Sequence, residues 1–162
     1  MKGLLPSQRR GRFAGAATVA VLLLGLGAGG VSSAAPSAHA ARRALNLSGT
    51  AHLHLTRKSG NVLYERGTAT GTLPGTVTAR LVTGVTRVSG TVTFYPRGGG
   101  SLTLSAVGYP QSAATIVHFT GHCAVSSGTG RFRAALGSGS FSGTANRRTW
   151  AVTVNAHAHL TY

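Results

Sequence analysis

The chain has 162 residues, with 16 Lys and Arg against one acidic residue, Glu65, and a formal net charge of +15. Because there is no Asp, paired carboxylates for acid–base chemistry cannot be assembled, and a Ser-His-acid triad would have to use Glu65 itself. The composition therefore excludes most hydrolytic and metal-dependent mechanisms and favours a non-catalytic role.

Residues 1–40 have the pattern of a secretory signal peptide. Basic residues precede an apolar stretch over residues 13–28, and a small-x-small site follows at residues 38–40. We expect cleavage before Ala41 and hence a secreted, extracellular protein. The alternative is a membrane anchor formed by an uncleaved N-terminal helix, but the apolar stretch is shorter than the ~20 residues that a membrane span needs.

Residues 41–162 are predicted to form a single domain, long enough to fold without a disulfide or metal. They keep 12 Lys and Arg against Glu65, a net charge of +11, and all but one of these cations are Arg. Such a charge favours anionic partners, such as a cell-wall polymer or a membrane surface. The alternative is a compositional bias, because the cations are scattered along the chain.

The dominant hydrophobic period of this domain is two residues. Between Leu45 and Thr56 the odd positions are apolar or small and the even positions are polar, which is typical of a half-buried strand. The last segment, residues 150–162, repeats this design. Further strand-like runs, separated by turns rich in Gly and Pro, lie near residues 61–70, 75–85, 88–95, 101–107, 113–125 and 131–143.

About eight short strands, each with one apolar face, predict an all-β fold. We expect an antiparallel, closed barrel of about eight strands, with a β-sandwich as the alternative. Closure into a barrel would also remove the edge strands, which this Thr-rich sequence would otherwise leave exposed.

One local motif is Ser127-Gly128-Thr129-Gly130-Arg131-Phe132-Arg133-Ala134-Ala135-Leu136-Gly137. Its glycines suit a tight turn, Phe132 suits an anchor in the core, and Ala135 with Gly137 permits close packing. The motif resembles a segment of the dirigent and allene oxide cyclase-like barrel family. The resemblance implies an eight-stranded antiparallel barrel. No Asp is present for the acidic pocket residues of the plant proteins, so the resemblance implies the fold rather than their chemistry.

A barrel of about eight strands has an interior that holds side chains or one small ligand. We therefore expect a non-catalytic module that binds a small apolar ligand in its interior or attaches to an anionic cell-envelope surface. No motif for a cofactor or for sequence-specific nucleic-acid binding is present. The residues expected to face the interior and to contact a ligand are Leu53, Leu55, Val92, Phe94, Leu102, Leu104, Phe119, Val152 and Val154.

Four histidines near the two ends of the domain form a candidate metal site. His52 and His54 share one strand face, as do His157 and His159. If the first and last strands pair, two or three of these imidazoles would bind Zn²⁺ or Cu²⁺ on the outside of the barrel. The alternative is a polar face that binds no metal, because no carboxylate is available to orient the imidazoles.

An enzyme of the isomerase or cyclase type is an alternative function. It would use Tyr, His or Cys123 in place of carboxylates. On a regular strand His118 and His122 lie on one face and Cys123 on the other, so we expect Cys123 to be a small buried side chain. We expect Glu65 to form a weak, exposed pair with Arg66.

Overall fold

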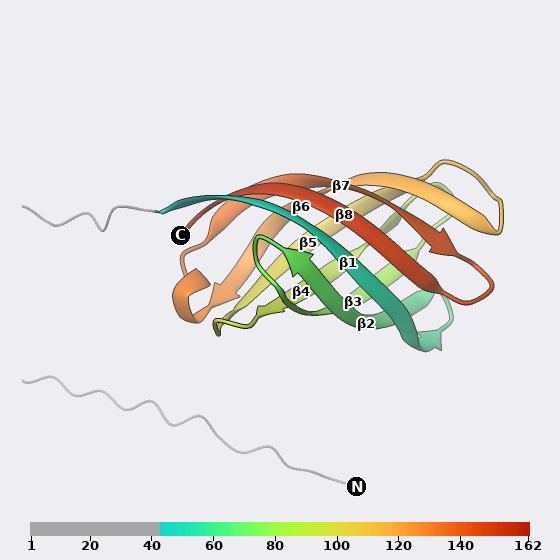
Figure 1. Cartoon of the computed structure of the whole chain (residues 1–162). Coiled ribbons are helices and arrows are strands. Elements are labelled where there is room, and N and C mark those ends of the chain that lie inside the picture. Colours follow the sequence, from blue (N-terminus) through green and yellow to red (C-terminus); the bar gives the residue numbers. More distant parts are fainter. Residues whose placement is uncertain (1–42) are drawn as a thin grey trace, which may run out of the picture. The chain divides into compact units, whose positions relative to one another are not determined.

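The computed structural model describes residues 43–162, which form a closed barrel of eight antiparallel strands (Figure 1). The predicted fold class is therefore confirmed, and the sandwich alternative is wrong. The strands are β1 (Ala44–Ser59), β2 (Val62–Gly71), β3 (Gly75–Thr83), β4 (Val88–Pro96), β5 (Ser101–Pro110), β6 (Ile116–Thr129), β7 (Leu136–Asn146) and β8 (Ala151–Thr161).

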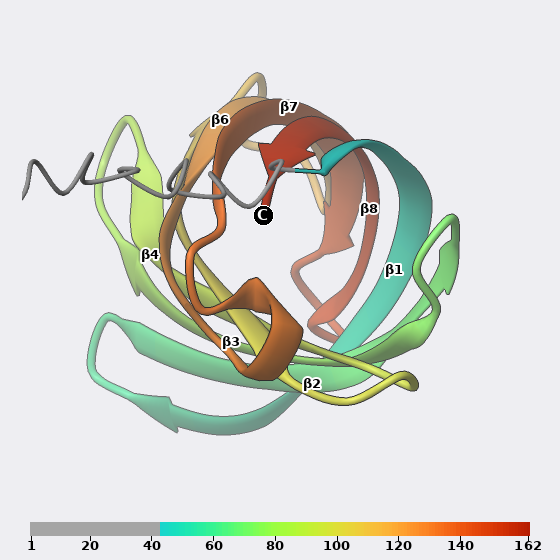
Figure 2. The ribbon, with the colours of Figure 1, turned by 90° about the vertical axis from the view of Figure 1, so that its left-hand side faces the viewer.

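Each strand pairs with its neighbours in sequence, and β8 pairs with β1 to close the ring (Figure 2). The strands are strongly staggered. The stagger can be followed from Leu53 of β1 through its cross-strand partners. The path through β8 and β7 arrives at Val117 of β6, whereas the path through β2, β3, β4 and β5 arrives at Gly128 of the same strand. Such a stagger requires tilted strands, as in the barrels that hold a small ligand.

Alternate residues of each strand face the inside and the outside of the barrel. The inward face carries the buried apolar side chains, among them Leu53, Leu63, Val77 and Leu102. The outward face carries mainly Thr, Ser, His and Arg, which are mostly exposed. The alternation read from the sequence thus places the apolar side chains inside.

One end of the barrel is closed by a hydrophobic plug. After β6, the short 3₁₀ turn η1 (Gly130–Phe132) lies across this end, facing the viewer in Figure 2. Phe132 is fully buried, its ring lies 5.2 Å from that of Tyr162, and Leu102, Ala135 and Leu160 complete the buried cluster. The packing roles expected for Phe132 and Ala135 are confirmed. The strand expected over 131–143 begins only at Leu136, because residues 130–135 form the plug.

The opposite end of the barrel carries the other four connections. Because the strands alternate in direction, the turns after β1, β3, β5 and β7 all lie there. At this end Lys58, near the end of β1, lies over the ring of Trp150, which directly precedes the neighbouring strand β8; its Nζ is 4.8 Å from the ring centre. The exposed cations of this end are Arg57, Lys58, Arg87, Arg147 and Arg148.

The predicted signal peptide and the alternative membrane anchor lie outside the described residues, which begin at Arg43. From residue 43 onward, the chain contains no helix with the length and hydropathy needed to cross a membrane.

Candidate functional site

The inside of the barrel is lined by an apolar wall with many small residues. Each of the eight strands places at least one Gly or Ala on this face; examples are Ala51 of β1, Ala79 of β3 and Ala106 of β5. Eight-stranded barrels have an interior that large side chains just fill. Because every strand of this barrel places Gly or Ala on the inward face, the side chains here fill less of the interior than large side chains would.

The nine residues expected to contact a ligand all lie on the inward face. They come from β1, β4, β5, β6 and β8, and cross-strand pairs such as Leu53 with Val152 and Phe94 with Leu102 join them. Leu53 and Leu102 are buried, whereas the other seven are only half-buried. The seven half-buried members are Leu55, Val92, Phe94, Leu104, Phe119, Val152 and Val154.

Two phenylalanines occupy part of the space that the glycines leave. The rings of Phe119 and Phe141 meet edge to face, with their centres 6.2 Å apart. A Cβ on Gly143 would lie 2.7 Å from the Phe119 ring, and a Cβ on Gly121 would collide with the Phe141 ring. The backbone carbonyls of Thr153 and Val107 on the neighbouring strands lie at least as close, so these glycines are required by the strand contacts together with the aromatic packing.

Glu65 is the one acidic side chain of the chain, and it lies inside the barrel. It occupies β2, directly opposite Leu55 of β1 and Ala79 of β3, and it is only 3% exposed. The expected surface pair with Arg66 is therefore wrong. The physical reason is strand parity: Glu65 shares the inward face with Leu63 and Gly67, whereas Arg66 points outward and is exposed.

The carboxyl group of Glu65 has no charged partner that would stabilise its ionised form. Desolvation by burial raises its pKa from 4.5 to about 7. Its Oε2 atom is buried and has no hydrogen-bond partner among the described residues. An unsatisfied buried carboxyl is costly to the fold, so its presence in this wall marks the interior as a candidate ligand site.

The sequence contained the signal that locates Glu65. In the run from Val62 to Gly71, the apolar and small residues Leu63, Gly67 and Ala69 share its parity. A carboxylate at the centre of an otherwise apolar strand face is rare, because burying an unpaired charge is unfavourable. Parity alone would therefore have indicated the buried position, but the usual preference of Glu for the surface led to the opposite prediction.

Cys123 also faces inward, on β6, opposite Ala106 of β5 and Gly139 of β7. Burial raises the pKa of its thiol, and a hydrogen bond with the Gly139 backbone partly offsets this effect. His118 and His122 of the same strand point outward and are exposed. The expected division of β6 into two faces is therefore confirmed.

The strand pairing expected for the four terminal histidines is present, but its register separates them. His52 pairs with Thr153, whereas His157 pairs with Ser48, four residues away along β1. This offset amounts to about 13 Å at ~3.3 Å per residue. His52 Nδ1 lies 3.2 Å from Thr153 Oγ1, and His159 Nδ1 lies 2.7 Å from Asn46 Oδ1.

The register therefore does not gather His52, His54, His157 and His159 around one point. Within residues 43–162, no group of three or more His, Cys or acidic side chains is arranged to hold a metal ion. A shared Zn²⁺ or Cu²⁺ site on the outside of the barrel, as considered from the sequence, has no support in this geometry.

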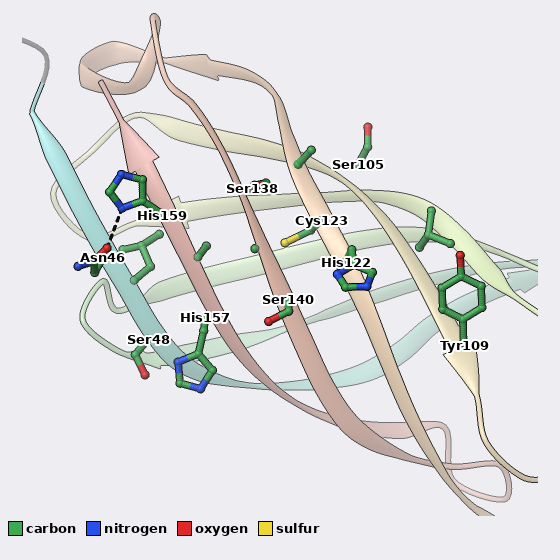
Figure 3. A pocket seen from close by; sticks show the side chains of 15 residues that line it. Asn46, Ser48, Ser105, Tyr109, His122, Cys123, Ser138, Ser140, His157 and His159 are labelled. Atoms are coloured by element: carbon green, nitrogen blue, oxygen red, sulfur yellow. Dashed lines mark hydrogen bonds between the residues drawn. The ribbon is translucent and has the colours of Figure 1, made fainter.

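An open groove of about 1040 Å³ runs over the outer surface (Figure 3). Its floor follows small residues such as Ser138, Gly139 and Ser140 of β7, and His122 and His157 lie on either side of Ser140 in the cross-strand row. Its lining combines Ser, Asn and His side chains with apolar ones such as Val107 and Ala124, and it contains no Lys or Arg. The groove was not predicted, because the register that aligns these rows cannot be read from the sequence.

The exterior differs sharply from the interior in charge. Every Lys and Arg among residues 43–162 is exposed, while the only acidic side chain is buried. The described outer surface therefore has cationic side chains and no acidic ones.

Compared with known proteins, the chain matches no family model, no curated protein and no solved structure. Its relation to the dirigent and allene oxide cyclase-like family stays a prediction.

Proposed function

We propose that this protein is an exported, non-catalytic barrel that binds a small, largely apolar molecule in its interior. The observation that carries the proposal is the inward face, which is apolar, contains Gly or Ala on every strand, and leaves most of its larger side chains only half-buried. Pockets for small ligands typically combine such apolar walls with a few polar groups. Glu65 supplies one such group.

The ligand would enter from the end that the plug does not cover. The buried cluster around Phe132 occupies one end, so access runs past the turns that follow β1, β3, β5 and β7. The half-buried Val92 and Val154 of the inward face would then contact the ligand.

A test uses the neutral, apolar fluorescent probe N-phenylnaphthylamine at pH 6, where Glu65 is largely protonated. The proposal predicts saturable binding to the purified protein. Replacing Ala106 by Phe puts a ring into the interior and should weaken binding by about tenfold or more. The neighbouring Ser105→Phe change places the same ring on the outer face and should leave the affinity unchanged.

Two outcomes would contradict the proposal. One is the absence of saturable binding. The other is equal loss of affinity in the Ala106→Phe and Ser105→Phe variants, or loss in Ser105→Phe alone, which would assign the probe to the outer groove, where Ser105 lies. Thermal unfolding of each variant must show that it is folded before its affinity is compared.

A second candidate function is attachment to an anionic surface of the cell envelope. It is favoured by the outer surface, whose charged side chains are all cationic in the described residues. Such binding would weaken steeply with added salt, whereas binding of an uncharged probe in the interior would not. The two functions are compatible, because they use opposite faces of the same sheet.

An isomerase or cyclase activity is the third candidate. The buried carboxyl of Glu65 now favours it, because a pKa of about 7 suits a group that donates or accepts protons at neutral pH. This candidate requires that Glu65→Gln abolish turnover of a cyclisable substrate.

A further inference from the structure

The wall around Glu65 offers its carboxyl group no polar partner. The residues directly opposite it are Leu55 and Ala79. Of the next inward positions on the two flanking strands, Leu53 on β1 and Val77 and Leu81 on β3 are apolar. The remaining one is Lys58, which the bulge after Leu55 places opposite Leu63 and whose ammonium lies over the Trp150 ring. The unpartnered Oε2 therefore faces an apolar interior.

The charged groups near Glu65 belong to the other face or to other partners. Tyr64 and Arg66, its chain neighbours, point outward, as does Arg80 of β3. The Arg57 guanidinium lies over the Tyr64 ring and the Lys58 ammonium over the Trp150 ring, each at 4.8 Å. Two other titratable side chains occupy inward positions on the strands: Cys123 of β6, and Lys58 of β1, which the bulge after Leu55 places opposite Leu63.

The protonated and the ionised form of this carboxyl are stabilised by different surroundings. The protonated form is neutral and offers one O–H donor, which a single acceptor oxygen on a ligand would satisfy. The ionised form is a buried charge without a partner, and it is stabilised only when water enters around it. A neutral apolar ligand that fills the interior excludes that water.

We propose that the interior of the barrel is a proton-gated site for a neutral apolar molecule with one hydrogen-bond-accepting oxygen, to which Glu65 donates. This inference rests on the proposed function. When Glu65 ionises, its proton passes to the solvent, the donor is lost, and the ligand leaves as water hydrates the carboxylate. The raised pKa of about 7 places this change near neutral pH.

The exposed cations at the open end of the barrel favour a neutral ligand over an amine. A ligand ammonium would pair with the carboxylate, but it would have to pass the open end, which carries exposed arginines such as Arg57, Arg87 and Arg147. These charges repel an approaching cation. A neutral ketone, ester or alcohol meets no such barrier.

The test measures binding of the neutral naphthyl ketone Prodan, whose carbonyl oxygen accepts a hydrogen bond, between pH 5.5 and pH 9. If only the protonated site binds, the apparent Kd is the intrinsic Kd divided by the protonated fraction. It should then rise about tenfold for each pH unit above about 7. In Glu65→Gln, where the amide donates at every pH, the Kd should stay constant over this range.

Arg66→Gln is the matched control, because it removes a charge next to Glu65 without changing the inward face. Its Kd should follow the same pH dependence as that of the unchanged protein. Since all three proteins keep every histidine, a dependence that arises from imidazoles would persist in Glu65→Gln and would overturn the inference. If the Gln variant does not fold, Glu65→Leu serves in its place: it should bind Prodan more weakly than the unchanged protein does at pH 5.5 and without pH dependence.

The failure of the gate and the failure of the proposed function are distinguishable. If N-phenylnaphthylamine binds in the interior at pH 6 but the Prodan Kd does not change with pH, only the gate is wrong. An affinity for Prodan that increases with pH would also overturn it. If neither probe binds saturably, the proposed function and the gate are both wrong.

Discussion

The most unusual side chain of this protein is Glu65, a carboxyl group buried in an apolar wall. A chain that otherwise lacks acidic side chains keeps its only one inside the barrel, 3% exposed and with an unpartnered oxygen. An apolar residue of similar size would pack there without this cost. The position is therefore better explained by a role in binding or proton transfer than by stability.

The raised pKa of Glu65 also makes the stability of the fold depend on pH. Between its ordinary pKa of 4.5 and its folded value of about 7, the folded protein keeps a proton that the unfolded chain releases. The free energy of unfolding should therefore fall by about 3 kcal/mol as the pH rises from below 4.5 to above 7. Urea unfolding across this range measures the effect.

Glu65→Gln is the control for this prediction. The histidines are shared by the two proteins, so their contribution cancels in the difference. An equal loss of stability in the Gln variant would show that Glu65 is not the cause.

The connection between β6 and β7 determines which end of the barrel is closed. Gly130 has a φ of +58°, a conformation that favours Gly, and it turns the chain so that Phe132 enters the barrel end. Phe132 is fully buried against Leu102 and Leu160. The sequence motif thus builds a plug rather than the start of a strand.

Removing the plug side chain should destabilise the barrel. Phe132→Ala is expected to lower the free energy of unfolding by about 3–5 kcal/mol, because it leaves a cavity in the buried cluster. Arg133→Ala, an exposed change in the same segment, should have an effect within about 0.5 kcal/mol. A loss below about 1 kcal/mol for Phe132→Ala, measured by urea unfolding, would mean that the plug does not hold this end closed.

At the scale of the whole molecule, the fold was predictable because alternation and turn residues recur along the chain. The strand limits agreed within a few residues for most strands, and the pairing of the first and last strands followed from closure. The register of the strand pairs could not be predicted from the sequence. A bulge between Leu55 and Arg57 shifts the pairing of β1 with β2. The pairing of β1 with β8 places His52 and His157 four residues apart.

The candidate site was predictable in part for the same reason. All nine apolar ligand candidates lie inside, since strand parity decides the face of each. Glu65 was misplaced because its charge was given more weight than its parity. The outer groove depends on how rows of small residues align across β5 to β8, which only the assembled sheet reveals.

The measurement that tests this account most directly is the titration of the Glu65 carboxyl by ¹³C NMR. Because the chain contains one acidic residue, labelling with [¹³C]Glu gives a single side-chain carboxyl signal. A carboxyl buried inside the barrel should titrate with a midpoint near pH 7. A midpoint near 4.5 would place the group in solvent, and it would contradict both the buried site and the proton gate.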